Sequence, residues 1–229
     1  VTVFSAVAYL FSRPLARICI APLFSAHPDL AGLVYTNLTD AFFSYLKLSI
    51  LAGIIASYPI IIFQIWMFVA PGLEGGEKRG VFLVVFFATM LFAAGVCFSY
   101  FIVLPKALEF FMGFAREGLE AKPKFGSYLT FVARMALAFG LAFEIPFLMV
   151  AAGKFGWVDR AYFARNRIYF YLAIGILSFL LTAGDILSAL LLSVPLFGLY
   201  EGGMLVMLVF SGKKKQDDEV GHDGKSLSV

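Results

Sequence analysis

Six apolar segments constrain the fold of this chain more than any other feature. Their approximate ranges are 1–11, 43–70, 81–105, 127–152, 167–183 and 186–209. Because an α-helix rises about 1.5 Å per residue and the hydrocarbon core of a bilayer is about 30 Å thick, about 20 apolar residues form one membrane span. We therefore predict an all-α membrane protein with six transmembrane helices, the first of them truncated in this chain.

The composition agrees with a polytopic membrane protein and offers little for catalysis. The chain is 61% hydrophobic and 14% charged, whereas soluble domains average about 45–50% apolar and about 25% charged residues. His27 and His222 lie far apart, Cys19 and Cys97 match neither a metal spacing nor a disulfide framework, and no catalytic or phosphate-binding motif is present. We expect a protein that is not an enzyme, holds no metal or cofactor, and binds no nucleic acid.

Basic residues gather on one side of the membrane if the six segments alternate in direction. They lie in the connections 71–80 and 153–166 and just after the last segment. Lys and Arg favour the cytoplasmic side, so we expect both termini to be cytoplasmic, although the other side also carries basic residues that nearby acids offset. Residues 1–211 would form the transmembrane domain, and the polar tail 212–229 should be disordered.

The last two segments look short for membrane spans. Residues 168–182 and 186–200, before Glu201, each amount to about 15 residues, or roughly 22 Å of helix. Two neighbouring helices of this length should thin the bilayer around them or recruit partner helices. No internal repeat is evident, which argues against a transporter built from inverted repeats.

A carboxylate in the fourth segment needs an explanation. Glu144 lies about ten residues before Lys154, or about 15 Å along a helix, so it should sit near the bilayer midplane. Pro146 removes a backbone donor, and we expect a kink beside it. Two interpretations stay open: Glu144 is protonated and bonded to a carbonyl or hydroxyl of this chain, or it serves a proton path or a polar group of another helix.

The connection after the second segment is a candidate binding site. Phe68 and Pro71 end a helix, and Glu77 follows, just before Lys78 and Arg79. A carboxylate beside an apolar platform suits an arginine-bearing peptide with an apolar tail, because guanidinium and carboxylate groups pair bidentately. The alternative is that the two basic residues are ordinary cytoplasmic-side residues and that Glu77 is a solvated carboxylate at a helix start.

Four stretches together resemble the TatC family, whose members are the six-span subunit of the twin-arginine protein translocase. They are SYPIIIFQIWMFVAPGLEGGEKR (57–79), FSYFIVLPKALEFF (98–111), SYLTFVARMALAFGLAFEIP (127–146) and LLTAGDILSALLLSVPLFGLYE (180–201). The first and third are the most specific, because Phe68, Pro71 and Glu77 stand at the family's spacing and Glu144 stands at the family's intramembrane glutamate.

The resemblance implies a curved, glove-like bundle in the cytoplasmic membrane of a bacterium, with two long external loops forming a cap. It implies a receptor for the twin-arginine signal peptides of folded cargo proteins. That receptor would gather single-span partners of the TatA and TatB types, associate with further copies of itself in the lipid bilayer, and use the proton motive force.

The resemblance also implies roles for individual residues. Signal-peptide binding would fall on Phe68, Pro71, Glu77, Lys78 and Arg79. A concave groove, open to lipid in the isolated subunit, and its partner contact would fall on Gln64, Glu144 and Pro146. Partner docking at the external turn would fall on Thr182 and Asp185, and the external cap would include Pro22, Thr39 and Asp40.

Two departures from the family pattern limit these roles. Ala183, Gly184 and Ala189 stand where the family often has TPPD followed by Gln, so the docking patch should be smaller. The family's amino-terminal acidic contact for the arginines lies outside this chain. Two alternatives to a translocase subunit also stay open, namely a proton-coupled small-molecule transporter using Glu144 and a structural subunit of a larger membrane complex.

Overall fold

The computed structural model describes residues 1–26, 32–34, 39–69, 78–113, 123–154, 158, 160–182 and 186–223. Within these ranges the regular elements are helices, accompanied by one isolated bridge between Val34 and Lys124. The prediction of an all-α protein is confirmed.

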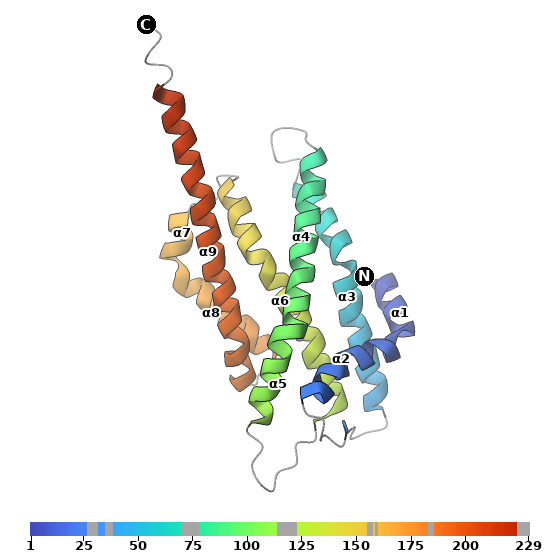
Figure 1. The fold of residues 1–229 in the computed structure, drawn as a ribbon. Coiled ribbons are helices and arrows are strands. Elements are labelled where there is room, and N and C mark those ends of the chain that lie inside the picture. The colour runs from blue at the N-terminus through green and yellow to red at the C-terminus, as the bar shows by residue number, and fades with distance from the viewer. Residues whose placement is uncertain are drawn as a thin grey trace.

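The helices follow the predicted apolar segments and form an elongated bundle (Figure 1). Their bounds are α1 Thr2–Leu10, α2 Ser12–Ala26, α3 Asp40–Val69, α4 Lys78–Phe98, the π-helix η2 Ser99–Val103, α5 Leu104–Met112, α6 Phe125–Lys154, α7 Arg160–Arg165, α8 Arg167–Leu181 and α9 Ile186–Asp223. We call the end of the bundle that carries α2 and the starts of α3, α6 and α9 the cap end. The opposite end, where α3 and α6 finish and α4 and α8 begin, is the tail end.

Four helical stretches in the described part of the chain are long and apolar enough to cross a membrane. They are Asp40–Phe68, Phe82–Met112, Phe125–Gly153 and Ile186–Leu208. Helices α1 and α2 pass the same test only as a pair, and this pair is bent by 78°. Since α8 is a shorter apolar helix, the structure supports four or five full spans, and the total of six stays a prediction.

The two C-terminal helices differ in length, which corrects one prediction. Helix α8 has 15 residues, as expected for a short span. The expectation that its partner also ends before Glu201 is wrong, because the apolar part of α9 runs for 23 residues, from Ile186 to Leu208. Helix α9 continues to Asp223, into the tail that we expected to be disordered. The division at residue 211 stays a prediction.

Helices α4 and α6 approach closely because glycine faces the partner helix at two positions. A Cβ atom at Gly95 would lie 2.4 Å from the carbonyl oxygen of Phe139, and one at Gly140 would lie 2.6 Å from the ring of Phe92. Small residues let membrane helices approach to backbone contact. This contact holds the middle of α6 in a fixed place against α4.

Two tyrosine hydroxyls attach α2 to the bundle at the cap end. Tyr100 in η2 donates to the carbonyl oxygen of Ile18 at 2.7 Å, and Tyr128 in α6 donates to that of Cys19 at 2.9 Å. These carbonyls lie just before Pro22, which has no N–H for the carbonyl of Ile18 to accept within the helix. The side chain of Tyr100 therefore takes the place of a missing backbone donor.

The two long connections meet beside this helix. The amide of Val34 donates to the carbonyl of Pro123 at 3.3 Å, and the amide of Phe125 donates to the carbonyl of Val34 at 2.9 Å. These bonds join residues about 90 positions apart in sequence and fix the start of α6. The described parts of both connections thus lie together at the cap end, in agreement with a cap.

Candidate functional site

The carboxylate of Glu144 is buried between two helices. Glu144 lies on α6 with 4% of its surface exposed, and Tyr58 lies on α3 with 7% exposed. The hydroxyl of Tyr58 donates to Oε1 of Glu144 at 2.9 Å. Of the interpretations left open by the sequence, the structure therefore shows the hydrogen bond to a hydroxyl of this chain.

This burial corrects the expected orientation of Glu144. We expected the side chain to face a groove open to lipid, and in this structure it does not, because only 4% of its surface is exposed and Tyr58 of α3 lies against the carboxylate. Contact with a partner helix stays a prediction, and it requires Glu144 to exchange its present partner or accept a second one.

The ring of Tyr58 is fixed by stacking. Its centroid lies 3.8 Å from that of Phe92 on α4, and the two planes differ by 7°. Phe92 in turn fills the space beside Gly140, one turn before Glu144 on α6. Three helices thus meet around the carboxylate, and the stacked ring directs the hydroxyl toward it. A buried acid without its partner would cost about 1–3 kcal/mol or more.

The other two residues expected in the groove lie apart from this bond. Pro146 is half-buried inside α6 and packs against α9, where a Cβ atom at Gly203 would lie 3.1 Å from the Cα of Pro146. Gln64 is exposed on α3, six residues after Tyr58 and so about 120° around that helix. The structure does not gather Gln64, Glu144 and Pro146 on one open surface.

At the tail end the structure describes only part of the predicted signal-peptide site. Phe68, in the last turn of α3, has 88% of its surface exposed, whereas Trp66 two residues earlier is buried. Pro71 and Glu77 lie outside the described residues. Lys78 and Arg79 begin α4, but their side chains also lie outside the description.

The predicted docking residues at the α8–α9 turn are also partly described. Thr182 follows α8, and its hydroxyl donates to the carbonyls of Ser178 at 2.9 Å and Phe179 at 3.2 Å. Thr182 therefore helps to end its own helix in this structure, and Asp185 lies outside the described residues.

Helix α8 also presents an exposed apolar face. The sequence predicted the helix but did not show which of its faces is exposed. Ile168, Leu172, Ile176 and Leu180 are all exposed and recur every four residues. This spacing places them on one side of the helix. It was visible in the sequence, but only the structure shows that α9 covers the opposite side.

The predicted cap residues take different positions. Pro22 lies buried inside α2, and its role in holding the shape of the cap stays a prediction. Thr39 is exposed just before α3, and Asp40 is the first residue of α3, where its carbonyl accepts a hydrogen bond from Ser44 at 2.5 Å.

A polar cluster between α8 and α9 escaped the sequence analysis. Glu201 accepts a hydrogen bond from the hydroxyl of Tyr171, and its Oε1 lies 3.8 Å from Nη1 of Arg167. These partners explain why a carboxylate does not interrupt the apolar span of α9. The pairing joins residues about 30 positions apart, so the local sequence pattern gave no sign of it. Among the described residues, no group of three or more His, Cys, Asp or Glu side chains could hold a metal ion.

Comparisons with known proteins identify the family of this chain. The family model described as "TatC: Sec-independent protein translocase protein (TatC)" matches residues 1–195. The chain belongs to the TatC family. The resemblance seen in the sequence is thereby confirmed.

TatC proteins from several bacteria match most of the chain. The protein of Desulforapulum autotrophicum is 38% identical over 213 residues, which cover 93% of this chain and 78% of the relative. The protein of Haemophilus influenzae is 36% identical over 219 residues, covering 96% of this chain and 84% of the relative. Both are described as the Sec-independent protein translocase protein TatC.

A solved TatC structure shares the fold. The crystal structure of a twin arginine translocase receptor, TatC, superposes with a TM-score of 0.84 at 31% identity and covers 91% of both chains. This likeness confirms the predicted fold class. Membership of the TatC family favours a subunit of a protein translocase, with a transport role, over the two alternatives that the sequence left open.

Proposed function

We propose that this chain is the receptor and assembly subunit of a twin-arginine translocase, which exports folded proteins using the proton motive force and performs no catalysis of its own. The observation that carries the proposal is the similarity to a twin arginine translocase receptor over 91% of both chains. Glu144 adds support, since a buried carboxylate inside a membrane bundle marks a functional site by default.

The signal peptide would bind at the tail end. Phe68 supplies an exposed apolar surface there, and Glu77 follows nine residues later in the sequence. Arginine pairs bidentately with a carboxylate, and a lysine does not reproduce this geometry. Pro71 would shape the loop between Phe68 and Glu77. Lys78 and Arg79 would lie beside this loop, on the cytoplasmic side of the membrane.

The tail end would face the cytoplasm, with both termini on that side. Two helices end and two begin there, close to the basic residues of segments 71–80 and 153–166. The cap end would face outward. This orientation places the proposed signal-peptide site where folded cargo is made, in the inner membrane of a bacterium.

Partner helices of the TatA and TatB types, and further copies of this chain, would bind along the spans. The exposed face of α8 is 15 residues long at most, too short to match a bilayer of about 30 Å without thinning it. Thr182 and Asp185 would border this face. A partner's polar group could then reach Glu144 from a thinned membrane at lower cost, in exchange for the hydroxyl of Tyr58.

A crosslinking experiment tests the receptor role. A photoreactive residue at Phe68 of the full chain in membranes is offered a signal peptide with two arginines and, separately, the same peptide with two lysines. We expect strong preference for the arginine peptide, and we expect Glu77→Gln to reduce that preference while Glu74→Gln, three residues earlier, retains it. Equal crosslinking of both peptides would overturn the proposal.

A further inference from the structure

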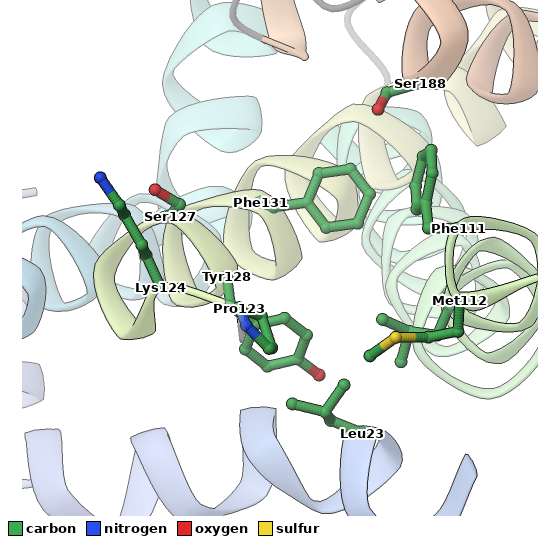
Figure 2. Close-up of a pocket in the computed structure, with 10 residues that line it drawn as sticks. Leu23, Phe111, Met112, Pro123, Lys124, Ser127, Tyr128, Phe131 and Ser188 are labelled. Atoms are coloured by element: carbon green, nitrogen blue, oxygen red, sulfur yellow. The ribbon is translucent and has the colours of Figure 1, made fainter. Parts of the chain in front are cut away.

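An open cavity lies at the cap end between α2, α5, α6 and the start of α9. Its volume is about 510 Å³, within the range of about 300–1,000 Å³ found for small-ligand sites. The apolar part of its wall consists of Leu23, Leu108, Phe111, Met112, Tyr128 and Phe131. Figure 2 shows the rings of Phe111 and Phe131 next to each other, with Met112 below Phe111 and Leu23 below Tyr128.

Contacts between helices hold these walls in place. The hydroxyl of Tyr128 is bonded to the carbonyl of Cys19 on α2. The rings of Phe111 on α5 and Phe131 on α6 meet edge to face with centroids 6.2 Å apart. Leu23 is almost fully buried, with 1% of its surface exposed. The cavity is therefore formed before any ligand arrives.

The cavity has one polar end. Lys124 and Ser127 line it together, and Figure 2 shows them side by side at the start of α6, away from the two phenylalanine rings. The side chain of Lys124 is exposed, and its backbone is fixed by the bridge to Val34. Among the described residues no acidic group neutralises Lys124, whereas Lys106 on the neighbouring α5 is paired with Glu109 at 3.2 Å.

We propose that this cavity binds an anionic phospholipid, with one acyl chain along Phe111, Met112 and Phe131 and the phosphate at Lys124 and Ser127. The span Phe125–Gly153 starts at the residue after Lys124, so the ammonium group lies where lipid headgroups meet the end of the bundle. Lys and phosphate form a charge-assisted hydrogen bond. Basic pockets between membrane helices on the cytoplasmic side recognise lipid headgroups in this way, and we propose the same pairing for the outward-facing cap end.

The charge at the mouth carries the selectivity in this proposal. An acyl chain gains little by leaving the bilayer for an apolar cavity, because lipid tails are as apolar as leucine side chains. Every lipid can supply such a chain, so only the headgroup distinguishes one lipid from another. A lysine without an acidic partner among the described residues favours a headgroup with net negative charge over a zwitterionic one, in which a cationic group accompanies the phosphate.

The walls fit an acyl chain better than an extended peptide segment. A peptide backbone in an apolar site must find a partner for each of its N–H and C=O groups. The described residues of its wall carry hydroxyls on Ser127, Tyr128 and Ser188, and at least that of Tyr128 is already bonded, to α2. An acyl chain has no polar groups to satisfy.

Photoreactive lipids test the proposal on the full chain in nanodiscs. Two probes carry the same diazirine-labelled acyl chain, one on phosphatidylglycerol and one on phosphatidylcholine, and mass spectrometry locates the labelled residues. We expect the phosphatidylglycerol probe to label Phe111, Met112 and Phe131 about fivefold more than the other probe, the factor typical of one basic residue near a membrane surface. Lys124→Gln should remove this difference, and Lys106→Gln should retain it.

A second variant tests the cavity itself. Met112→Trp fills the space and should lower labelling at Phe111 and Phe131 by both probes, while exposed positions such as Phe101 on the outer surface keep their labelling. Equal labelling of the cavity by both probes, a loss that Lys106→Gln reproduces, or labelling that Met112→Trp leaves unchanged would each overturn the proposal. So would a cavity labelled by neither lipid.

Discussion

The hydroxyl of Tyr58 donates a hydrogen bond of 2.9 Å to the carboxylate of Glu144, across the interface between α3 and α6. Both side chains are buried, and 86 positions separate them in the chain. The bond explains how a carboxyl group is accommodated inside an apolar bundle. It also limits which partner helices can bind Glu144. That partner must supply a polar group at least as favourable as the tyrosine hydroxyl.

We predict that Tyr58→Phe lowers stability and favours partner binding. The ring and its stacking on Phe92 are retained, so the variant removes the hydroxyl alone and leaves Glu144 without this donor. The expected loss in the free energy of unfolding is about 1–3 kcal/mol, measurable by thermal unfolding in detergent. Crosslinking from Leu148, exposed one turn after Glu144, to a TatA- or TatB-type helix should increase.

The exposed Tyr162 on α7 supplies the control for this prediction. Tyr162→Phe removes a hydroxyl from a side chain that is 49% exposed, and it should change neither quantity. Unchanged stability in Tyr58→Phe would show that Glu144 does not depend on this bond. Reduced crosslinking in that variant would show that Tyr58 helps the partner instead of competing with it.

Two substitutions at Glu144 separate packing from chemistry. Glu144→Gln keeps the size of the side chain, and its amide oxygen can still accept the hydroxyl of Tyr58, so we expect stability close to that of the parent chain. Glu144→Ala empties part of the three-helix contact and leaves the tyrosine unpaired, at a cost of about 1–3 kcal/mol. Export of a twin-arginine reporter should fall in both variants, because neither offers an ionisable group.

Comparing export by the two variants shows whether Glu144 acts through its charge or through hydrogen bonding. If Glu144→Gln exports the reporter normally while Glu144→Ala does not, the residue acts through hydrogen bonding and not through its charge. Normal export in both variants would remove Glu144 from the mechanism that we propose.

We predict that Gly140→Ala disturbs the contact between Tyr58 and Glu144 indirectly, through the ring of Phe92. Its Cβ atom would lie 2.6 Å from the ring of Phe92, which is buried and stacked on Tyr58. The ring must move, and overpacking of this kind costs typically about 1–3 kcal/mol. Gly175→Ala on α8 is the matched control, because nothing lies within 4 Å of the added methyl group.

The control substitution should be neutral or stabilising, since alanine is favoured over glycine in a helix by about 1 kcal/mol. The thermal unfolding midpoints of the two variants in the same detergent provide the measurement. Equal destabilisation by Gly140→Ala and Gly175→Ala would contradict the importance of the α4–α6 contact.

The sequence was sufficient for features that depend on long local patterns. The apolar runs located α3, α4 and α6, because a membrane span needs about 20 apolar residues whatever its neighbours are. The same reasoning identified Glu144 as exceptional. The motif around Phe68 and Glu144 was specific enough to indicate the family.

The features that the sequence did not provide depend on residues that are distant in the chain. Tyr58 was part of a matching stretch, but nothing local indicated that it would reach Glu144. Likewise, we expected the last span to end before Glu201, because a carboxylate is unfavourable inside an apolar helix. The sequence did not show that Tyr171 and Arg167 on α8 contact this carboxylate. A buried polar group is read correctly only when its partner is known, and that partner is a product of the fold.

The cluster of Arg167, Tyr171 and Glu201 leads to a final prediction, on the continuity of α9. The ion pair is 3.8 Å long, and its side chains are 46% and 39% exposed. In water such a pair would contribute less than about 1 kcal/mol. Glu201 lies within the apolar span Ile186–Leu208, however, where an unpaired charge is costly.

We therefore expect Arg167→Gln and Glu201→Gln each to lower the thermal stability of the chain in lipid nanodiscs, and the double variant to recover part of the loss. Removing both charges leaves no unpaired ion in the membrane, so the two effects should be non-additive. Arg165→Gln, on an exposed position of α7, serves as the control and should have little effect. Additive losses in the double variant would mean that Arg167 and Glu201 act independently, and that α9 crosses the membrane without needing this pair.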